Sequence, residues 1–383
     1  MNIPKDSGAR RTTVAIAADR DGVTNHESRV TNHDAAPFAS RIIAWQRLHG
    51  RHDLPWQNTR DPYRIWLSEI MLQQTQVSAV TPYFHRFISR FPDLASLAAA
   101  TEDEVLTLWA GLGYYARGRN LRKAAQTIAR DFGGVFPGSY ESVCTLPGVG
   151  RSTASAICVF AYGARWAILD GNVKRVLARY FGIEGYPGDK PVENLLWARS
   201  EAALPQRNIE AYTQGLMDLG ATICGRSRPR CDMCPVRATC VAFRENRTRD
   251  LPAARPAKVL AERTTTMVVL WSQGELLLEK RPSPGIWGGL WCFPEVDSNR
   301  LAEECLARFG VQIGECESMR EIDHGFTHFR LRITPVVAHT TRGFRAEEPG
   351  RLWLTLDDAL GAAIPAPVKR ILNTLSSHVP VIN

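Results

Sequence analysis

The chain has 383 residues, too many for one ordinary hydrophobic core and suited to two domains of roughly 100 to 200 residues each. Hydrophobic residues make up 44% and charged residues 22% of it, as in soluble globular proteins, so a fibrous or wholly disordered chain is excluded. No apolar run approaches the roughly 18 residues of a membrane span, and the N-terminus lacks the apolar segment of a secretory signal. We therefore expect a cytoplasmic protein.

Lysine and arginine number 47 against 39 aspartates and glutamates, which gives a net charge of +8. This excess permits an anionic partner such as nucleic acid without proving one. Four of the nine cysteines lie between positions 224 and 240, and the others are scattered. In a cytoplasmic chain such crowding indicates metal binding, and the scattered cysteines are expected to be buried thiols.

Residues 1–36 mix charges of both signs with threonine, asparagine and alanine and show no sustained apolar period, which predicts a disordered extension. An arginine-rich targeting peptide is the alternative. Such peptides are poor in acidic residues. The segment contains Asp6, Asp19, Asp21, Glu27 and Asp34, which argue against it.

From residue 37 to 248 the apolar residues recur at spacings of three and four, which predicts a mostly α-helical domain. Asp61 followed by Pro62 has the form of a helix N-cap and a first helical position, and opens the segment YRIWLSEIMLQQ. Thr75 is expected to cap the next helix, which runs through Phe87.

Further helices are expected at 116–132, which is rich in arginine and lysine, and from the segment 171–173, directly after Asp170, to Arg179. Prolines among alanines and charges predict a linker at 249–263. The remaining residues, 264–383, are expected to form a separate α+β domain. Its helix pattern is LAEECLARF, and its strand patterns are TTMVVLW, ELLLEKR and LRITPVVAH.

The four clustered cysteines have the spacing C-x6-C-x2-C-x5-C. Four thiolates can bind a tetrahedral zinc ion or the corners of a cubane iron–sulfur cluster, and spacing alone leaves both open. Arginines interleave with them, which suits contact with a phosphate backbone, although solvated arginines beside a metal site are the alternative. The proposed ligands are Cys224, Cys231, Cys234 and Cys240.

The segment LPGVG at 146–150 lies between two helical patterns and has the form of a helix-hairpin-helix turn. Gly148 and Gly150 would let the backbone approach a phosphate closely, and the following helix would present its first N–H groups to the anion. Such a turn binds DNA backbone rather than sequence. A plain αα-hairpin could use the same residues.

Two carboxylates stand in surroundings that should shift their pKa values in opposite directions. Glu69 lies in an apolar stretch, where desolvation raises the pKa of a carboxyl and keeps a proton available. Asp170 precedes a helix, and a helix N-terminus favours the ionised form. One acid and one anion suit cleavage of a glycosidic bond. Taken singly, a solvated helix residue and a simple N-cap are the alternatives, and the sequence does not show that the two side chains meet.

The hairpin, the acid that follows it by 20 residues and the four-cysteine loop together resemble the endonuclease III superfamily of DNA glycosylases. Within it, WLSEIMLQQTQV, GLGYYARGRNL, LPGVGRSTA and ILDGNVKRVLAR resemble the adenine DNA glycosylases of the MutY type. The resemblance implies a multidomain fold, in which a mostly α-helical helix-hairpin-helix domain with a cluster loop at 224–240 precedes an α+β Nudix (MutT-like) domain. It also implies that the cysteines hold a [4Fe–4S] cluster.

The resemblance further implies excision of adenine mispaired with 8-oxoguanine, or with guanine, after the base has left the stack. Glu69 would protonate adenine N7, Asp170 would stabilise the C1′ cation, and Asn172 would help to position the group. Gln74 would fill the vacated stack, and Tyr114 would wedge beside 8-oxoguanine. The adenine pocket would be lined by Trp56 and Leu72, for which core packing is the alternative.

In the lyase members of the superfamily, a lysine two residues after the last hairpin glycine attacks the sugar as a Schiff-base nucleophile. Ser152 stands at that position and cannot form the imine, so water is the expected nucleophile. Lys174, one turn past Asp170, is expected to contact a DNA phosphate, and incidental trapping of an abasic product is the alternative. An endonuclease III type pyrimidine glycosylase with lyase activity is the enzymatic alternative, disfavoured by Ser152 and by the second domain.

The second domain retains only part of a Nudix box. Gly289, Glu295 and Glu304 fit its positions, but Ala307 and Arg308 replace its paired metal-binding glutamates. Without these ligands a Mg²⁺-dependent pyrophosphohydrolase is not expected. The domain resembles the module with which this family recognises 8-oxoguanine, so we expect a binding domain.

The loop that reaches the oxidised base in this family matches Phe326, Thr327 and His328. Serine is usual at position 327, and threonine keeps its hydroxyl while adding a methyl group. A long basic side chain is expected at position 52, where His52 stands, and this weakens the expectation of a direct contact with adenine.

The sequence thus predicts a monomeric, monofunctional glycosylase that acts on double-stranded DNA with 8-oxoguanine·A or G·A mispairs in the bacterial cytoplasm. Other repair or replication proteins stay open as partners. A cluster-bearing lesion sensor that binds without cutting is the non-enzymatic alternative. The presence of both Glu69 and Asp170 favours the enzyme.

Overall fold

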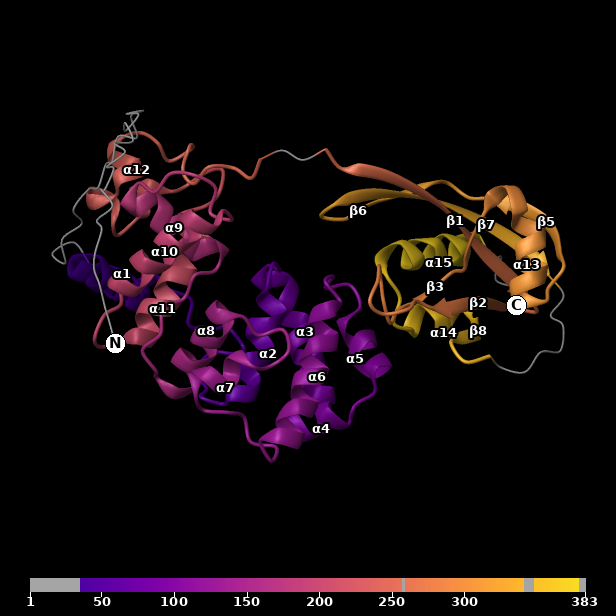
Figure 1. Cartoon of the computed structure of the whole chain (residues 1–383), viewed down its shortest axis with the longest axis horizontal. Helices are drawn as coiled ribbons and strands as arrows, with labels where there is room; N and C mark the ends of the chain where they lie inside the picture. Colours follow the sequence, from indigo (N-terminus) through magenta and orange to yellow (C-terminus); the bar gives the residue numbers. More distant parts are fainter. Residues whose placement is uncertain (1–34, 257–258, 341–347, 379–383) are drawn as a thin grey trace, which may run out of the picture.

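The computed structural model describes residues 35–256, 259–340 and 348–378. Nearly all of the extension expected at 1–36 lies outside these residues. A helical part precedes a part built on a β-sheet, as the apolar patterns predict (Figure 1). Within the described ranges, no helix has the length and apolar character that crossing a membrane requires.

The helical part is a succession of mostly short helices. They are α1 (Ala35–His49), α2 (Pro62–Leu72), α3 (Val77–Arg90), α4 (Leu94–Ala99), α5 (Glu102–Trp109), α6 (Ala116–Asp131), α7 (Tyr140–Cys144), α8 (Arg151–Tyr162), α9 (Gly171–Phe181), α10 (Lys190–Ala202), α11 (Ile209–Asp218), the π-helix η1 (Leu219–Ile223), the 3-10 turns η2 (Cys231–Met233) and η3 (Arg237–Thr239), and α12 (Val241–Arg244).

Two hydrophobic cores divide this part into two lobes. The first core uses side chains between Trp56 and Ala161, and the second packs α1 against α9, α10 and α11. Helix α8 joins them, because Ile157 faces the first core and Val159 faces the second. The chain crosses from the second lobe to the first in the segment between α1 and α2.

Helix ends near α2 differ in part from the expected ones. Asp61 caps α2 by accepting a hydrogen bond from the Tyr63 N–H at 2.9 Å, as predicted, but the helix ends at Leu72. The expected cap at Thr75 is wrong, because α3 begins at Val77 after Gln76. The Thr75 hydroxyl lies instead 3.0 Å from the side chain of Arg117, which donates to it.

The second part holds a mixed sheet with the strand order β3-β2-β1-β7-β5, to which β4, β6 and β8 add. Strands β1 and β7 pair in parallel, and the other pairs are antiparallel. The elements are β1 (Ala261–Ser272), β2 (Glu275–Lys280), β3 (Trp291–Cys292), β4 (Glu295–Val296), η4 (Ser298–Arg300), α13 (Leu301–Phe309), β5 (Ile313–Ser318), β6 (Ile322–Gly325), β7 (Phe329–Thr340), β8 (Arg351–Thr355), α14 (Leu356–Gly361) and α15 (Ala366–His378).

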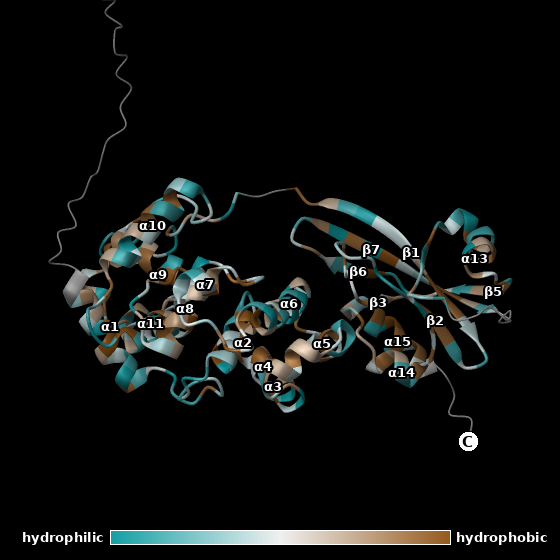
Figure 2. Cartoon of the chain, turned by 60° about the horizontal axis from the view of Figure 1, so that its bottom comes forward, coloured by the Kyte–Doolittle hydropathy of each residue, from teal (hydrophilic) through white to brown (hydrophobic). Residues whose placement is uncertain are grey.

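Helices cover both faces of this sheet. Side chains alternate along a strand, so Met267 and Val269 of β1 face the core beneath α14 and α15, while Val268 and Leu270 face α13. Figure 2 shows the hydrophobic residues of the central strands and of α14 and α15. Strand β1 begins at Ala261, so it takes up the end of the segment expected to be a linker.

The two parts touch through α5. Leu106 of α5 is fully buried and belongs to the core beneath α14 and α15. Lys280 pairs with Asp103 at 2.7 Å, and the side chain of Arg119 donates a hydrogen bond to the carbonyl of Gly288. Gly289 also lies against α5, since a Cβ there would lie 2.5 Å from Glu102 Oε1 and 3.1 Å from Leu106 Cδ1, and its φ of +81° favours glycine.

Candidate active site

An open cavity of about 510 Å³ lies where elements of the two lobes meet. Its walls come from the segment after α1, from α2 and from α11. Glu69, Trp56 and Leu72 all line it, so the structure brings together the acid and the two residues expected around adenine. Polar lining is provided by Gln46, Arg51, His52, Gln57, Asn58, Thr59, Arg60, Glu210 and Gln214.

Glu69 is partly buried in the last turns of α2. Loss of water contact, and secondarily the negative charge of Asp170, raise the pKa of Glu69 to about 8. The carboxyl therefore holds a proton at neutral pH, as expected for a general acid. The two carboxyls are therefore near enough to interact electrostatically, although their segments are about a hundred residues apart.

Asp170 is the N-cap of α9, and its Oδ1 accepts a hydrogen bond from the Val173 N–H at 2.7 Å. The expectation of a lowered pKa is wrong, because burial raises the pKa of Asp170 above its ordinary value. The hydrogen bonds from α9 and the charges of Arg175 and Lys174 act in the opposite direction without outweighing burial. Of the two carboxylates, Glu69 is among the residues that line the cavity and Asp170 is not.

The first turn of α9 carries two more of the predicted residues. Asn172 accepts a hydrogen bond from the Arg175 guanidinium at 2.9 Å, which fixes its amide beside Asp170. Lys174 pairs with Glu193 at 2.7 Å and donates to the carbonyl of Pro187. A DNA phosphate at Lys174 would therefore compete with an ion pair.

A buried acid that the sequence analysis missed stabilises the cavity wall. Asp218, with its side chain 1% exposed, pairs with Arg51 at 2.6 Å and also accepts hydrogen bonds from the Arg51 backbone N–H and from Gln214. These contacts hold the start of the wall segment against α11. A lone acid within the apolar run GLMDLGA was the available signal.

The aromatic and imidazole rings of the wall are fixed by packing. Trp56 is 8% exposed and makes an edge-to-face contact with Phe84, with ring centroids 5.4 Å apart, so it both packs in the core and lines the cavity. His52 lies with Nε2 2.9 Å from the carbonyl oxygen of Gln46. The ring thus contacts the protein backbone at the cavity wall.

Gln74 and Tyr114, the residues expected to enter the DNA stack, are both exposed. Each has a left-handed backbone, with φ of 57° at Gln74 and 49° at Tyr114. Non-glycine residues seldom adopt this region, which marks both loops as sites held by their surroundings.

The hairpin has the backbone geometry that its glycines predict. Gly148 has φ of +80°, and a Cβ there would lie 2.9 Å from the Cβ of Asn120. Gly150 is the N-cap of α8 and offers no side chain to its first N–H groups. Two residues later, the Ser152 hydroxyl accepts a hydrogen bond from the Leu169 N–H at 2.9 Å.

The four clustered cysteines line one small cavity of about 30 Å³ beside α9. Burial raises the pKa of the Cys231 and Cys240 thiols and raises that of Cys234 to about 12. Across the described ranges, no group of three His, Cys, Asp or Glu side chains could hold a single metal ion. Four thiols around one apolar cavity are a donor set suited to a metal centre, whose positive charge would stabilise the thiolates.

The residues expected to read the lesion lie at the tip of a tight hairpin between β6 and β7. The Phe326 N–H donates to the carbonyl of Phe329 at 2.9 Å, and their rings stack with centroids 4.5 Å apart. This closes the turn so that Thr327 and His328 are exposed at its end.

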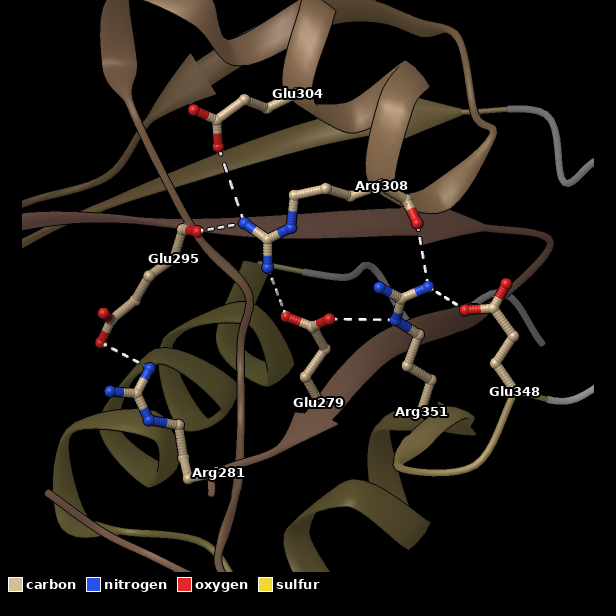
Figure 3. Close-up of polar contacts among 7 residues, drawn as sticks. All are labelled: Glu279, Arg281, Glu295, Glu304, Arg308, Glu348 and Arg351. Carbon is tan, nitrogen blue, oxygen red and sulfur yellow. Dashed lines mark hydrogen bonds and ion pairs between the residues drawn. The ribbon is translucent and has the colours of Figure 1, made fainter. Parts of the chain in front are cut away.

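In the Nudix-box region, the side chains of Arg308 and Arg351 lie among glutamates, as Figure 3 shows. Arg308 on α13 donates to Glu279 at 2.8 Å and to the Glu295 carbonyl at 2.6 Å, and lies 3.6 Å from Glu304. Arg351 binds the other oxygen of Glu279 at 3.0 Å. Carboxylates that a divalent cation could use are thus paired with guanidinium groups.

Family models match both parts of the chain. Residues 67–202 match the HhH-GPD superfamily of base excision DNA repair proteins, and residues 265–374 match the NUDIX domain. A solved structure of a thermostable thymine-DNA glycosylase is 30% identical, with a TM-score of 0.51, and covers 56% of this chain and 98% of its own. Fold and site together define a helix-hairpin-helix DNA repair protein with an appended Nudix domain.

Full-length relatives narrow this class. An adenine DNA glycosylase of Buchnera aphidicola is 37% identical over 344 residues, which is 89% of this chain and 98% of the relative. An adenine DNA glycosylase of Mus musculus is 30% identical over 90% of this chain and 79% of its own length. The chain belongs to the adenine DNA glycosylase family.

Proposed function

We propose that this protein removes adenine mispaired with 8-oxoguanine, or with guanine, from duplex DNA and so begins base excision repair. The supporting observation is that Glu69 lies at the wall of a cavity, where burial and the charge of Asp170 raise its pKa to about 8. The relatives of this chain are named adenine DNA glycosylases. The work would take place in the bacterial cytoplasm, where the DNA is.

In the proposed reaction, Glu69 donates its proton to N7 of an extrahelical adenine, which weakens the bond between N9 and C1′. As that bond breaks, its electron pair stays with the base and positive charge develops on the sugar. The Asp170 carboxylate stabilises this charge. Glu69, now ionised, accepts a proton from the water that attacks C1′, so an abasic site and free adenine result.

DNA binding would involve both parts of the chain. The backbone N–H groups after Gly148 and Gly150 suit a phosphate, and Gln74 and Tyr114 reach toward the base stack. On the opposite strand, Thr327 and His328 at the β6–β7 tip would contact 8-oxoguanine. The arginine-filled Nudix region supports recognition rather than hydrolysis by the second part.

We also propose that the four cysteines hold a [4Fe–4S] cluster, which would stabilise the loop at 224–240. Iron and labile sulfide content, with the visible absorption of anaerobically purified protein, test this. Cys234→Ser should lower iron content sharply. Zinc in place of iron in the wild-type protein would contradict the assignment.

The decisive experiment is single-turnover release of adenine from a duplex with one 8-oxoguanine·A pair. Wild-type protein should release adenine, and Asp170→Asn should bind the duplex while losing most of the release, because the carboxylate charge is gone. Tight binding without release by the wild-type chain would favour a lesion sensor. Release of damaged pyrimidines with strand cleavage would favour the endonuclease III type activity.

A further inference from the structure

A single buried arginine links the two loops that carry Gln74 and Tyr114. Arg117, in the first turn of α6, is 8% exposed. Its guanidinium donates hydrogen bonds to both loops. The acceptors are the carbonyls of Ile70 (3.0 Å), Met71 (2.7 Å), Gln73 (2.6 Å), Leu112 (3.3 Å) and Gly113 (3.2 Å) and the hydroxyl of Thr75 (3.0 Å).

These acceptors lie at the end of α2 and in the two loops, where regular helical hydrogen bonding stops. Two of them also accept a longer bond from within their own loop, Gly113 from Trp109 Nε1 and Gln73 from the Thr75 hydroxyl, each at 3.3 Å. Ile70 and Met71 lie in the last turn of α2, where carbonyls lack helical N–H groups and the helix dipole favours a cation. Gln73 and Thr75 flank Gln74, and Leu112 and Gly113 directly precede Tyr114. One planar group therefore fixes the chain on both sides of Gln74 and directly before Tyr114.

The hydrogen bonds of Arg117 that are described run to neutral oxygens rather than to a carboxylate. Burial lowers the pKa of Arg117 to about 10, so the group stays charged at neutral pH. Its Cζ also lies 5.5 Å from the centroids of the Trp109 and Tyr114 rings. A lysine could not replace this fork, since one ammonium nitrogen cannot reach acceptors in both loops with the same geometry.

We propose that Arg117 is the positioning residue that sets the spacing of Gln74 and Tyr114, so that both side chains enter the duplex as one unit. This inference rests on the proposed function, because it explains how the Gln74 and Tyr114 side chains are positioned to enter the duplex when the adenine is extruded. Arg117 fixes the left-handed backbone at the two loop tips before DNA binds. The free energy of ordering these loops is therefore not spent when the base is extruded.

The first test needs no DNA. In Arg117→Lys, amide hydrogen exchange at residues 70–75 and 111–115 should rise together, while α9 and the sheet stay as protected as in the wild type. The matched control is Arg122→Lys on the same helix, because Arg122 donates to the carbonyl of Ala100, away from both loops. Unchanged protection of both loops in Arg117→Lys would overturn the proposal.

The second test measures extrusion directly. With 2-aminopurine opposite 8-oxoguanine, the wild type and Arg122→Lys should show the same rise in fluorescence and the same rate of base release. Arg117→Lys should show a smaller rise in fluorescence and should release the base about 100-fold more slowly, the scale expected for an ångström-sized misplacement. Melting temperatures of the two variants, measured alongside, show whether a general loss of stability accounts for the difference. Equal slowing in both variants would contradict a positioning role.

A double-mutant comparison completes the design. If Arg117 acts through Tyr114, then Tyr114→Ala should add little to the extrusion defect of Arg117→Lys, whereas independent effects would multiply. Multiplying effects would refute the linkage even if extrusion fell. A failure of the proposed function can be told apart from a failure of this inference. In that case wild-type protein neither extrudes nor releases adenine, but amide exchange in the two loops still rises in Arg117→Lys.

Discussion

The hydroxyl of Ser152 accepts a hydrogen bond from the backbone N–H of Leu169 at 2.9 Å. Leu169 directly precedes Asp170, so the first turn of the helix after the hairpin is tied to the segment that carries the buried acid. The position at which lyases of this superfamily carry a nucleophilic amine is therefore a structural contact next to the candidate site.

Ser152→Lys should give the protein a Schiff-base activity that the wild type lacks, because the new amine would stand beside the segment of Asp170. We expect borohydride to trap a covalent complex with an abasic product only in this variant. Ser152→Ala is the control, since it also loses the Leu169 contact but adds no amine. Trapping in the alanine variant as well would show that another lysine is responsible.

Activity should fall as the pH rises through about 8, because Glu69 can donate a proton only while it holds one. Single-turnover rates measured on either side of that pH test the assignment. In Glu69→Gln the rate should be low throughout and should lose this dependence. A wild-type rate that stays constant above pH 8 would rule out Glu69 as the acid.

Stability should follow the same group. The folded-state pKa of Glu69, about 8, exceeds the ordinary 4.5, so the folded protein binds more protons than the unfolded chain between these values. Glu69 therefore stabilises the fold fully below pH 4.5 and loses this contribution as the pH rises to about 8. Glu69→Gln should raise the melting temperature relative to the wild type increasingly across that interval. A constant difference would contradict the raised pKa.

The sequence predicted those elements whose position and ends depend on residues near to them in the chain. The helix Leu301–Phe309 lies where the apolar spacing indicated, and Asp61 caps α2, as expected of an Asp-Pro pair ahead of an apolar helical pattern. The loop after Leu72 could not be predicted, since it is held by Arg117, which lies about forty residues further along the chain. Contacts at that separation leave no periodic trace.

The candidate site shows the same division. Glu69 and Asp170 were recognisable from their apolar and helix-terminal neighbours, but the direction of the Asp170 pKa shift depends on how many other segments exclude water from it. The role of Asp218 could not be predicted, because its partner Arg51 lies 167 positions away in the chain. Burial and ion pairing are properties of the assembled lobes.

Discrimination between 8-oxoguanine·A and G·A should depend on the Thr327 hydroxyl. Thr327→Val keeps the shape of the hairpin tip and removes one hydrogen-bonding group, so we expect the preference for the oxidised pair to fall by about tenfold. Thr327→Ser, which keeps the hydroxyl, is the matched control and should retain the preference. Competition between the two duplexes measures both variants. Equal preference in Thr327→Val and the wild type would remove the hydroxyl from lesion recognition.

Arg308→Glu should create a divalent-cation site in the Nudix domain. The substitution replaces the guanidinium that now pairs with Glu279 and approaches Glu304, and it gathers carboxylates that repel one another without a metal. Mn²⁺ should then bind by calorimetry, and added metal should stabilise the variant by about 2.7 kcal/mol at a free concentration 100 times Kd. Arg308→Met removes the cation without adding a ligand, so it should show neither effect. If the variant with glutamate stays as indifferent to Mn²⁺ as the variant with methionine, the arginine does not occupy the place of a metal.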